Sequence, residues 1–262
     1  MHEIWYSCGG VASKGVHNTM SWRRFSRFIP PRLRFRVLDW KRRFAGSSAH
    51  SYAQYGEDVI LAEIFKDRQD GFFVDVGAHH PTRYSNTYLL YQKGWHGINI
   101  DPNEESIAMF RKERSRDTSI ECGVGSTEGE RIYYRFSDPA VNSFSKEDAE
   151  RWMKKDWITF LGEKHVPVLK LSTILKRHAP GQHVDLLTVD AEGLDLEVLD
   201  SNDWDAMTPD VIIVEDHGFD VGDPDASAVY RYLVEKFYRL HTVADPSLIF
   251  CVAGFPRDDG VV

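Results

Sequence analysis

The chain has 262 residues, of which 42% are hydrophobic, so it is long and apolar enough for one α/β domain with a large core. Its net charge of −8 is unevenly distributed: residues 1–50 hold ten basic and two acidic side chains, and residues 51–262 hold 22 basic and 38 acidic side chains. A strongly acidic body repels phosphates, which argues against binding to nucleic acids. The three cysteines, Cys8, Cys122 and Cys251, are far apart and form no C-x-x-C pair. This pattern argues against a zinc site and favours a reducing, cytoplasmic compartment.

Residues 1–50 are predicted to be an arm that precedes a single folded domain at residues 51–262. Within the arm, residues 21–44 interleave six aromatic side chains with arginines, and Pro30-Pro31 breaks any continuous helix. No apolar run approaches the roughly 20 residues of a membrane span. A basic, aromatic segment can nevertheless lie on an anionic membrane surface, such as the inner face of the plasma membrane. An arm that packs on the acidic domain or stays in water is an equal alternative.

Strands and helices are predicted to alternate after the arm, as in a βαβαβ unit. The predicted strands lie at residues 72–78, 98–100 and 119–124, and the predicted helices lie at residues 56–67, 85–93 and 104–114. The first strand begins FFVDV, which is apolar enough to be buried on both faces, and Gly77 then permits a tight turn. Asp101 follows the second strand, at a place where a carboxylate can hold both hydroxyls of a ribose.

The turn GAHHPT, residues 77–82, differs from the G-x-G-x-x-G turn of dinucleotide sites. His79 and Thr82 replace the second and third glycines, and Pro81 lacks an N–H that could bind a pyrophosphate. The predicted ligand therefore carries a ribose but no diphosphate, and S-adenosylmethionine fits that description. The candidate cofactor-binding residues are Asp75, Gly77, Ser85, Asn86, Asp101 and Val124. His79 and His80 are neighbours on an extended turn and should point apart, so they do not predict a metal site.

The alternation of predicted strands and helices is interrupted between the first and second halves of the domain. Residues 131–136 predict an outlying strand, and residues 137–165 are polar but keep several aromatic side chains. These rings favour a lid or an acceptor platform, because flat apolar rings stack on sugar rings; an ordinary helix packed on the sheet is the alternative. The remaining predicted elements are a strand and a helix within residues 166–178, strands at residues 185–190 and 210–217, a helix at residues 226–237 and a terminal hairpin of residues 238–244 and 248–253.

Four motifs at the ends of predicted strands resemble those of the FkbM family of S-adenosylmethionine-dependent methyltransferases. They are V-D-V-G-A at residues 74–78, Asp101-Pro102, D-A-E-G at residues 190–193 and the strand that ends at Glu215. The lead-in YAQYGEDVIL and the motif P-x-x-Y-S-N-T, residues 81–87, match one branch of the family. The resemblance covers residues 52–253. Asp101 stands where Glu is commoner and Ala191 where Val is commoner, and neither departure puts the cofactor in doubt.

The resemblance implies a Rossmann-like class I methyltransferase fold for residues 51–262, with a mostly parallel seven-stranded sheet, helices on both faces and a C-terminal antiparallel hairpin. It also implies S-adenosylmethionine as cofactor and methyl transfer to an oxygen, most often a sugar hydroxyl of a glycan or a glycosylated metabolite. One rival is an NAD-dependent nucleotide-sugar oxidoreductase or epimerase, against which the missing glycines argue. Another is a non-catalytic glycan-binding module, against which the intact Asp75, Gly77 and Asp101 argue.

A sugar hydroxyl is a poor nucleophile, so its proton needs a base or a metal. The candidates follow the two central strands, at the edge where open α/β sheets bind ligands: Asp190, Glu192, Glu215, Asp216 and His217. In the favoured alternative there is no metal, and His217 or Glu192 takes the proton beside Asp190. In the other alternative Asp190, Glu215 and Asp216 hold Mg²⁺, which lowers the pKa of the acceptor hydroxyl. Helix capping explains one of these acids but not all of them.

Overall fold

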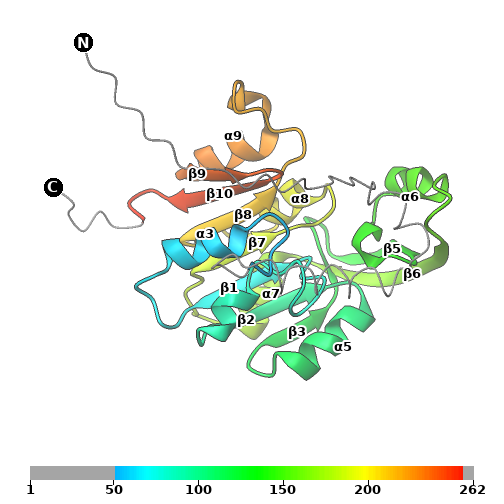
Figure 1. Cartoon of the computed structure of the whole chain (residues 1–262), viewed down its shortest axis with the longest axis horizontal. Helices are drawn as coiled ribbons and strands as arrows, with labels where there is room; N and C mark the ends of the chain where they lie inside the picture. The colour runs from blue at the N-terminus through cyan, green and yellow to red at the C-terminus, as the bar shows by residue number, and fades with distance from the viewer. Residues whose placement is uncertain (1–50, 256–262) are drawn as a thin grey trace, which may run out of the picture. The chain divides into compact units, whose positions relative to one another are not determined.

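The computed structural model describes residues 51–255, and the predicted arm at residues 1–50 lies outside them. A seven-stranded sheet in the order β3-β2-β1-β7-β8-β10-β9 forms their centre (Figure 1). Its strands are β1 (Phe72–Val76), β2 (His96–Asp101), β3 (Thr118–Glu121), β7 (Leu186–Val189), β8 (Val211–Glu215), β9 (Tyr238–Ala244) and β10 (Ser247–Val252). The first five of these run parallel, and the hairpin places β10 antiparallel to β8. The predicted Rossmann-like fold, with its antiparallel hairpin, is confirmed.

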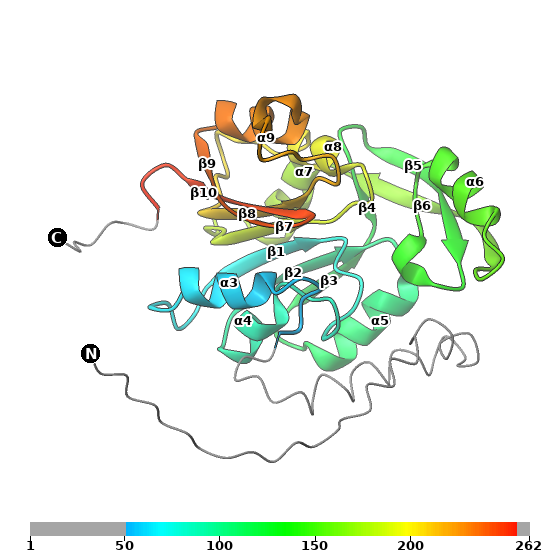
Figure 2. The ribbon, with the colours of Figure 1, turned by 45° about the horizontal axis from the view of Figure 1, so that its top comes forward.

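Helices cover both faces of this sheet (Figure 2). One face carries α3 (Glu57–Ile64), α4 (Tyr88–Gln92) and α5 (Glu104–Glu113), and the other carries α7 (Leu171–His178), α8 (Asp195–Asp200) and α9 (Ala228–Glu235). All residues of β1 are buried, with Phe73 in one core cluster beside Leu61 and with Val74 and Val76 in the other. A strand that is covered on both faces needs a nearly continuous apolar run, as the sequence predicted. No helix within residues 51–255 has the length and apolar content needed to cross a bilayer.

A second sheet of three strands, in the order β4-β6-β5, stands beside the central one (Figure 2). Its strands are β4 (Gly123–Val124), β5 (Gly129–Phe136) and β6 (Phe160–Leu169). Between β5 and β6 lie a 3-10 turn, Pro139–Val141, and helix α6 (Lys146–Met153); another 3-10 turn, Pro224–Ala226, precedes α9. Tyr134 and Phe136 of β5 pack with Ala149 of α6 and with Ile158. This small core holds α6 against the second sheet.

Two predicted boundaries are wrong in this region. The strand predicted at residues 119–124 is divided, because β3 joins the central sheet whereas β4 pairs with β6. The insertion predicted at residues 137–165 ends earlier, because β6 begins at Phe160 and pairs with β5 as far as Val168. Residues 160–165 are exposed or half-buried, so their hydrophobic pattern does not predict a strand. Their strand depends on long-range pairing with β5, which local sequence does not show.

A buried ionic network ties the first half of the central sheet together. The side chain of Arg114 is fully buried, and its Nε donates to Asp117 Oδ2 over 2.7 Å. Its Nη1 donates to Thr87 Oγ1 over 2.9 Å, and Thr87 Oγ1 donates to Asp75 Oδ2 of β1 over 2.7 Å. Asp117 also accepts a hydrogen bond from Asn99 Nδ2 of β2 over 2.9 Å. The network therefore joins β1 and β2 to the segments that precede α4 and β3.

The network places one guanidinium and two carboxyl groups in a buried environment. The ring centroids of Phe73, Tyr91 and Phe110 lie 5.0, 4.8 and 5.3 Å from the guanidinium carbon of Arg114. Burial raises the pKa of Asp75 to about 6, although the hydrogen bond from Thr87 and the charge of Arg114 oppose the shift. Removing one member of a buried pair leaves the other charge without compensation, which is strongly destabilising.

We expect Arg114→Met to lower the free energy of unfolding by roughly 3–5 kcal/mol, because Asp117 would remain buried without its cation. Urea denaturation of the variant and the parent protein measures this change. Arg151→Met is the matched control, since the Arg151 side chain is 74% exposed and pairs with Asp148 one turn away on α6. Equal denaturation midpoints for the two variants would show that the buried pair contributes no more than the surface pair.

Candidate functional site

A cavity of about 330 Å³ opens at the carboxyl ends of β1, β2, β7 and β8. Gly77 and Asp101 line it from the first two of these strands. Asp190, Glu192, Glu215 and His217 follow the other two strands and also line the cavity. In an open α/β sheet, ligands bind at this edge. The structure thus brings together most of the predicted site residues, which lie far apart in the sequence.

Gly77 holds the turn after β1 in a left-handed conformation, with φ 75°. A Cβ atom at this position would lie 1.8 Å from the carbonyl oxygen of Asp190, so no other residue fits. The sequence predicted a tight turn at Gly77 and a place for it in the cofactor site. In the structure Gly77 lines the cavity, and its closest neighbour is the backbone that follows β7. Gly77 therefore locks the ends of β1 and β7 together at the floor of the cavity.

Asp101 ends β2 and holds the turn after β1 from the opposite side. Its Oδ2 accepts a hydrogen bond from the backbone N–H of His79 over 2.8 Å, and its Oδ1 accepts one from the N–H of Asn103 over 2.7 Å. Burial raises the pKa of Asp101 to about 6 in spite of these two donors. Each carboxylate oxygen still has a second lone pair with which to accept a hydrogen bond from a ligand.

Val124 lines the cavity from β4, whereas three other predicted cofactor-binding residues are absent from its wall. Asp75 accepts its hydrogen bond from Thr87, in the buried network. The Ser85 hydroxyl accepts a hydrogen bond from the N–H of Tyr88 at the start of α4, and Asn86 Nδ2 donates to Thr188 Oγ1 over 3.1 Å. The structure thus places Asp75, Ser85 and Asn86 in the packing beside the cavity, where they support the turn.

His79 and Tyr84 are cavity residues that were not among the predicted site residues. The rings of His79 and Tyr84 stack with centroids 6.3 Å apart, and both residues line the cavity. Both also have left-handed backbones, with φ 54° and 53°, and so does Glu192, with φ 50°. This conformation is unfavourable for residues other than glycine and tends to occur at functional sites. The H-H pair and the Y of P-x-x-Y-S-N-T were the sequence signals for them.

The two neighbouring histidines point in different directions, as predicted. His79 lines the cavity, and burial lowers its pKa, so its imidazole is neutral at pH 7. His80 turns into its own loop, where Nδ1 accepts hydrogen bonds from the N–H groups of Thr82 and Arg83 over 3.1 and 3.2 Å. His80 is buried, and its ring satisfies these two donors of the loop.

Carboxylates crowd the ends of β7 and β8. Burial and the nearby Glu215 carboxylate raise the pKa of Asp190 well above its usual value. Glu192 lines the cavity and is partly exposed to water, but protein surrounds most of its carboxyl group. Desolvation and the charges of Glu215 and Asp195 raise the pKa of Glu192 to about 7. His217, whose side chain is 77% exposed, lies with Nε2 3.3 Å from Glu215 Oε2. This arrangement offers a carboxylate that can accept a proton near neutral pH.

The predicted alternative magnesium site does not assemble. Asp216 Oδ2 accepts a hydrogen bond from Ser227 Oγ over 2.6 Å, and its Oδ1 accepts one from the N–H of Gly218. Asp216 is therefore turned towards the segment before α9 and does not line the cavity. Asp190, Glu215 and Asp216 do not bring three ligand atoms together, so the structure gives the magnesium alternative no support.

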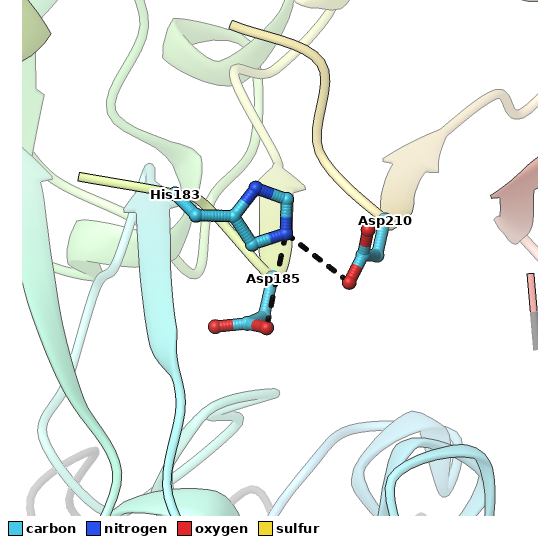
Figure 3. Close-up of side chains that lie close together, drawn as sticks. All are labelled: His183, Asp185 and Asp210. Atoms are coloured by element: carbon cyan, nitrogen blue, oxygen red, sulfur yellow. Dashed lines mark ion pairs between the residues drawn. The ribbon is translucent and has the colours of Figure 1, made fainter. Parts of the chain in front are cut away.

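Among residues 51–255, one group of three side chains has the spacing of metal ligands, and it lies away from the cavity. His183 Nε2 is 3.2 Å from Asp210 and 4.0 Å from Asp185 (Figure 3). Arg68 forms ion pairs with both carboxylates, and Asp185 Oδ2 accepts a hydrogen bond from the N–H of Phe72 over 2.7 Å. Arg68 already supplies the positive charge that these two carboxylates need. The group therefore joins the beginnings of β1, β7 and β8.

The second sheet and the segment between β5 and β6 form another part of the cavity wall. Tyr133 and Phe144 contribute rings whose centroids lie 4.8 Å apart, and Trp152 of α6 adds a third ring. The cavity wall therefore has an acidic part and an aromatic part. Lys164 of β6 forms ion pairs with Glu104 over 2.7 Å and with Glu121 over 2.9 Å. These pairs attach the second sheet to α5 and β3.

The solved structures that are similar to the chain include two methyltransferases. A TehB-like SAM-dependent methyltransferase from Corynebacterium glutamicum is 12% identical with a TM-score of 0.40, over 85% of this chain and 100% of that chain. Precorrin-6y C5,15-methyltransferase from Geobacter metallireducens is 8% identical with a TM-score of 0.39, over 78% of this chain and 90% of that chain. No curated protein matches the sequence.

The model of the methyltransferase FkbM domain matches residues 75–240. The matched region begins in β1 and ends in β9, so it contains the whole second sheet and all of the central sheet except β10 and parts of β1 and β9. It includes nearly every residue that lines the cavity. Membership of a methyltransferase family excludes the predicted rival of an oxidoreductase or epimerase. Because the match covers more than half of the chain, the protein belongs to the FkbM methyltransferase domain family.

Proposed function

We propose that the protein transfers a methyl group from S-adenosylmethionine to a hydroxyl of a saccharide. The observation that carries the proposal is the position of Asp101, a buried carboxylate at the end of β2 that faces the same cavity as the acids after β7 and β8. It can hold the ribose of a nucleoside within reach of a second group of carboxylates. S-adenosylmethionine supplies a methyl group on a positively charged sulfur, from which an oxygen nucleophile can displace it.

The residues around Asp101 fit a nucleoside without a diphosphate. Ile100 and Val124 offer apolar surface for a base. His79 stands where a dinucleotide site needs its second glycine, and its ring stacks on Tyr84 in the cavity wall. A pyrophosphate would meet these rings instead of bare backbone N–H groups. The same turn suits S-adenosylmethionine, whose amino-acid end is smaller and carries no phosphate.

The aromatic part of the cavity wall suits a saccharide acceptor. Tyr133, Phe144 and Trp152 present rings on which the apolar face of a sugar can pack, in the same cavity as the acids. Glu192 is the base in this proposal, because its raised pKa lets it take up the hydroxyl proton near pH 7. As the new oxygen–carbon bond forms, the sulfur–carbon bond breaks and the proton moves to Glu192.

S-adenosylhomocysteine should raise the melting temperature of the protein, and NAD should not, because the turn cannot hold a pyrophosphate. We expect Asp101→Asn to weaken the binding of S-adenosylhomocysteine roughly ten- to a hundredfold in calorimetry, since the ribose hydroxyls lose the charged carboxylate that accepts their hydrogen bonds. Asp220→Asn is the control, because Asp220 is exposed and accepts from Gly222 in a loop outside the cavity wall. Equal affinity in the Asp101 and Asp220 variants would remove Asp101 from the cofactor site.

The same binding should depend on pH. Asp101 has a pKa of about 6, and ribose hydroxyls donate to its ionised form, so affinity should rise as the pH increases through about 6. Binding below that pH should release protons, which calorimetry in buffers of different ionisation enthalpy detects. The dependence should vanish in Asp101→Asn and persist in Asp75→Asn, because Asp75 also has a pKa of about 6 but lies outside the wall. The reverse result would assign the effect to Asp75.

Methyl transfer to a glycan extract, followed by mass spectrometry, tests the base. We expect Glu192→Gln to lower kcat by roughly 10²–10⁴ and to leave S-adenosylhomocysteine affinity nearly unchanged. The parent enzyme should become faster as the pH rises through about 7, since Glu192 must be ionised to accept the proton. His217→Asn should keep most of its activity, and EDTA should not inhibit. If His217→Asn lost activity and Glu192→Gln did not, His217 would be the base.

A further inference from the structure

The segment from the last residue of α6 to the start of β6, residues 153–161, carries several exposed apolar side chains; we call it the apolar loop. Met153 is 44% exposed, Trp157 58%, Phe160 37% and Leu161 58%. Within the same segment, Ile158 is buried with Tyr134 and Phe136. A soluble domain rarely presents several large apolar side chains on one short segment without using them for binding.

Hydrogen bonds and a ring contact hold the apolar loop in place, so its exposed side chains have a defined position at the surface. The N–H of Ser137 donates to Thr159 O over 2.8 Å, and the N–H of Thr159 donates to Ser137 Oγ over 3.0 Å. The Trp157 ring stands edge-on against that of Trp152, with centroids 5.7 Å apart. The loop lies on the part of the protein that α6, β5 and β6 form at one side of the central sheet (Figure 1).

The charge of the apolar loop is opposite to that of the domain around it. Lys154 and Lys155 are both exposed, and Asp156 is the single acid between Met153 and Leu161. Residues 51–262 as a whole hold 22 basic and 38 acidic side chains. The loop therefore combines exposed lysines with exposed Trp, Leu and Met on a domain that is otherwise acidic. Lysine stems can lie along apolar surface while their ammonium groups remain in water.

We propose that the apolar loop docks on the surface of an anionic lipid bilayer. Trp157 and Leu161 would enter the interface between headgroups and acyl chains, where tryptophan is favoured, and Lys154 and Lys155 would face the anionic headgroups. A stable protein partner is a weaker explanation, because a specific interface buries roughly 1,000 Å² or more, which exceeds the tip of one loop. Trp152 lines the cavity and contacts Trp157, so the bilayer would lie beside the cavity.

This docking goes beyond the proposed function and does not depend on it. It also differs from the membrane contact predicted for residues 21–44, which lie outside the described residues. A test must therefore report on the apolar loop itself and not on adhesion of the whole chain. A fluorophore attached at one position of the loop meets this need, because its emission rises only where that position leaves water.

The experiment uses the full chain with Cys8→Ser and Leu161→Cys, labelled with the environment-sensitive dye NBD. Cys122 and Cys251 are buried, so the dye reacts at position 161. Vesicles contain phosphatidylcholine with about a quarter phosphatidylglycerol, to attract the lysines. The matched control carries the dye through Phe237→Cys, since Phe237 is 78% exposed and lies between α9 and β9.

We expect vesicles to raise emission at position 161 by roughly twofold or more, as the dye enters the interface, and to leave position 237 unchanged. Lys154→Glu with Lys155→Glu should abolish the rise, and so should high salt. No rise at position 161 would overturn the proposal, even if the protein floats with the vesicles, because the arm alone would then hold the membrane. An equal rise at both positions would also overturn it, since docking would not be directed by this loop.

Discussion

The neutralisation of one buried positive charge organises the first half of the domain. Arg114 has no contact with water, so its guanidinium must find acceptors and ring faces inside the protein. Asp117 and Thr87 accept its hydrogen bonds, and Thr87 extends the link to Asp75. These groups come from β1 and from the segments before α4 and β3. The network consequently fixes the segments around the turn that follows β1, and the cavity opens directly beyond that turn.

This network separates the roles of two acids that look alike in the sequence. Asp75 and Asp101 are both buried, and burial raises the pKa of each to about 6. Asp75 lies within β1, opposite Asn99 of β2, and its carboxylate accepts from Thr87. Asp101 lies at the very end of β2, where its carboxylate holds the His79 backbone and lines the cavity. The position along the strand therefore decides which carboxylate supports the fold and which can meet a ligand.

The second sheet and the segment between its strands β5 and β6 turn an open edge of the central sheet into a cavity with an acidic part and an aromatic part. The ion pairs of Lys164 attach this sheet to α5 and β3. A ligand in the cavity needs both polar groups and apolar surface, as a nucleoside and a saccharide have. The same insertion carries Trp152 on its inner side and Trp157 on its exposed side. One small structural unit thus shapes the cavity and also an apolar surface next to it.

The sequence by itself determined most of the strands and helices and the terminal hairpin, because strand runs, helical spacing and turn residues are local patterns. That the strands form one mostly parallel sheet was implied by the resemblance of its motifs to the family. It also determined that Asp101, Asp190, Glu192 and Glu215 lie at one edge, since parallel strands end there together. Only the tertiary structure decided that β5 and β6 pair as a second sheet, because that pairing joins distant segments. It likewise decided that Asp75, Ser85 and Asn86 support the turn while His79 and Tyr84 enter the wall. Side-chain direction at a turn depends on backbone conformation and on partners such as Thr87 and Thr188, which no local pattern reveals.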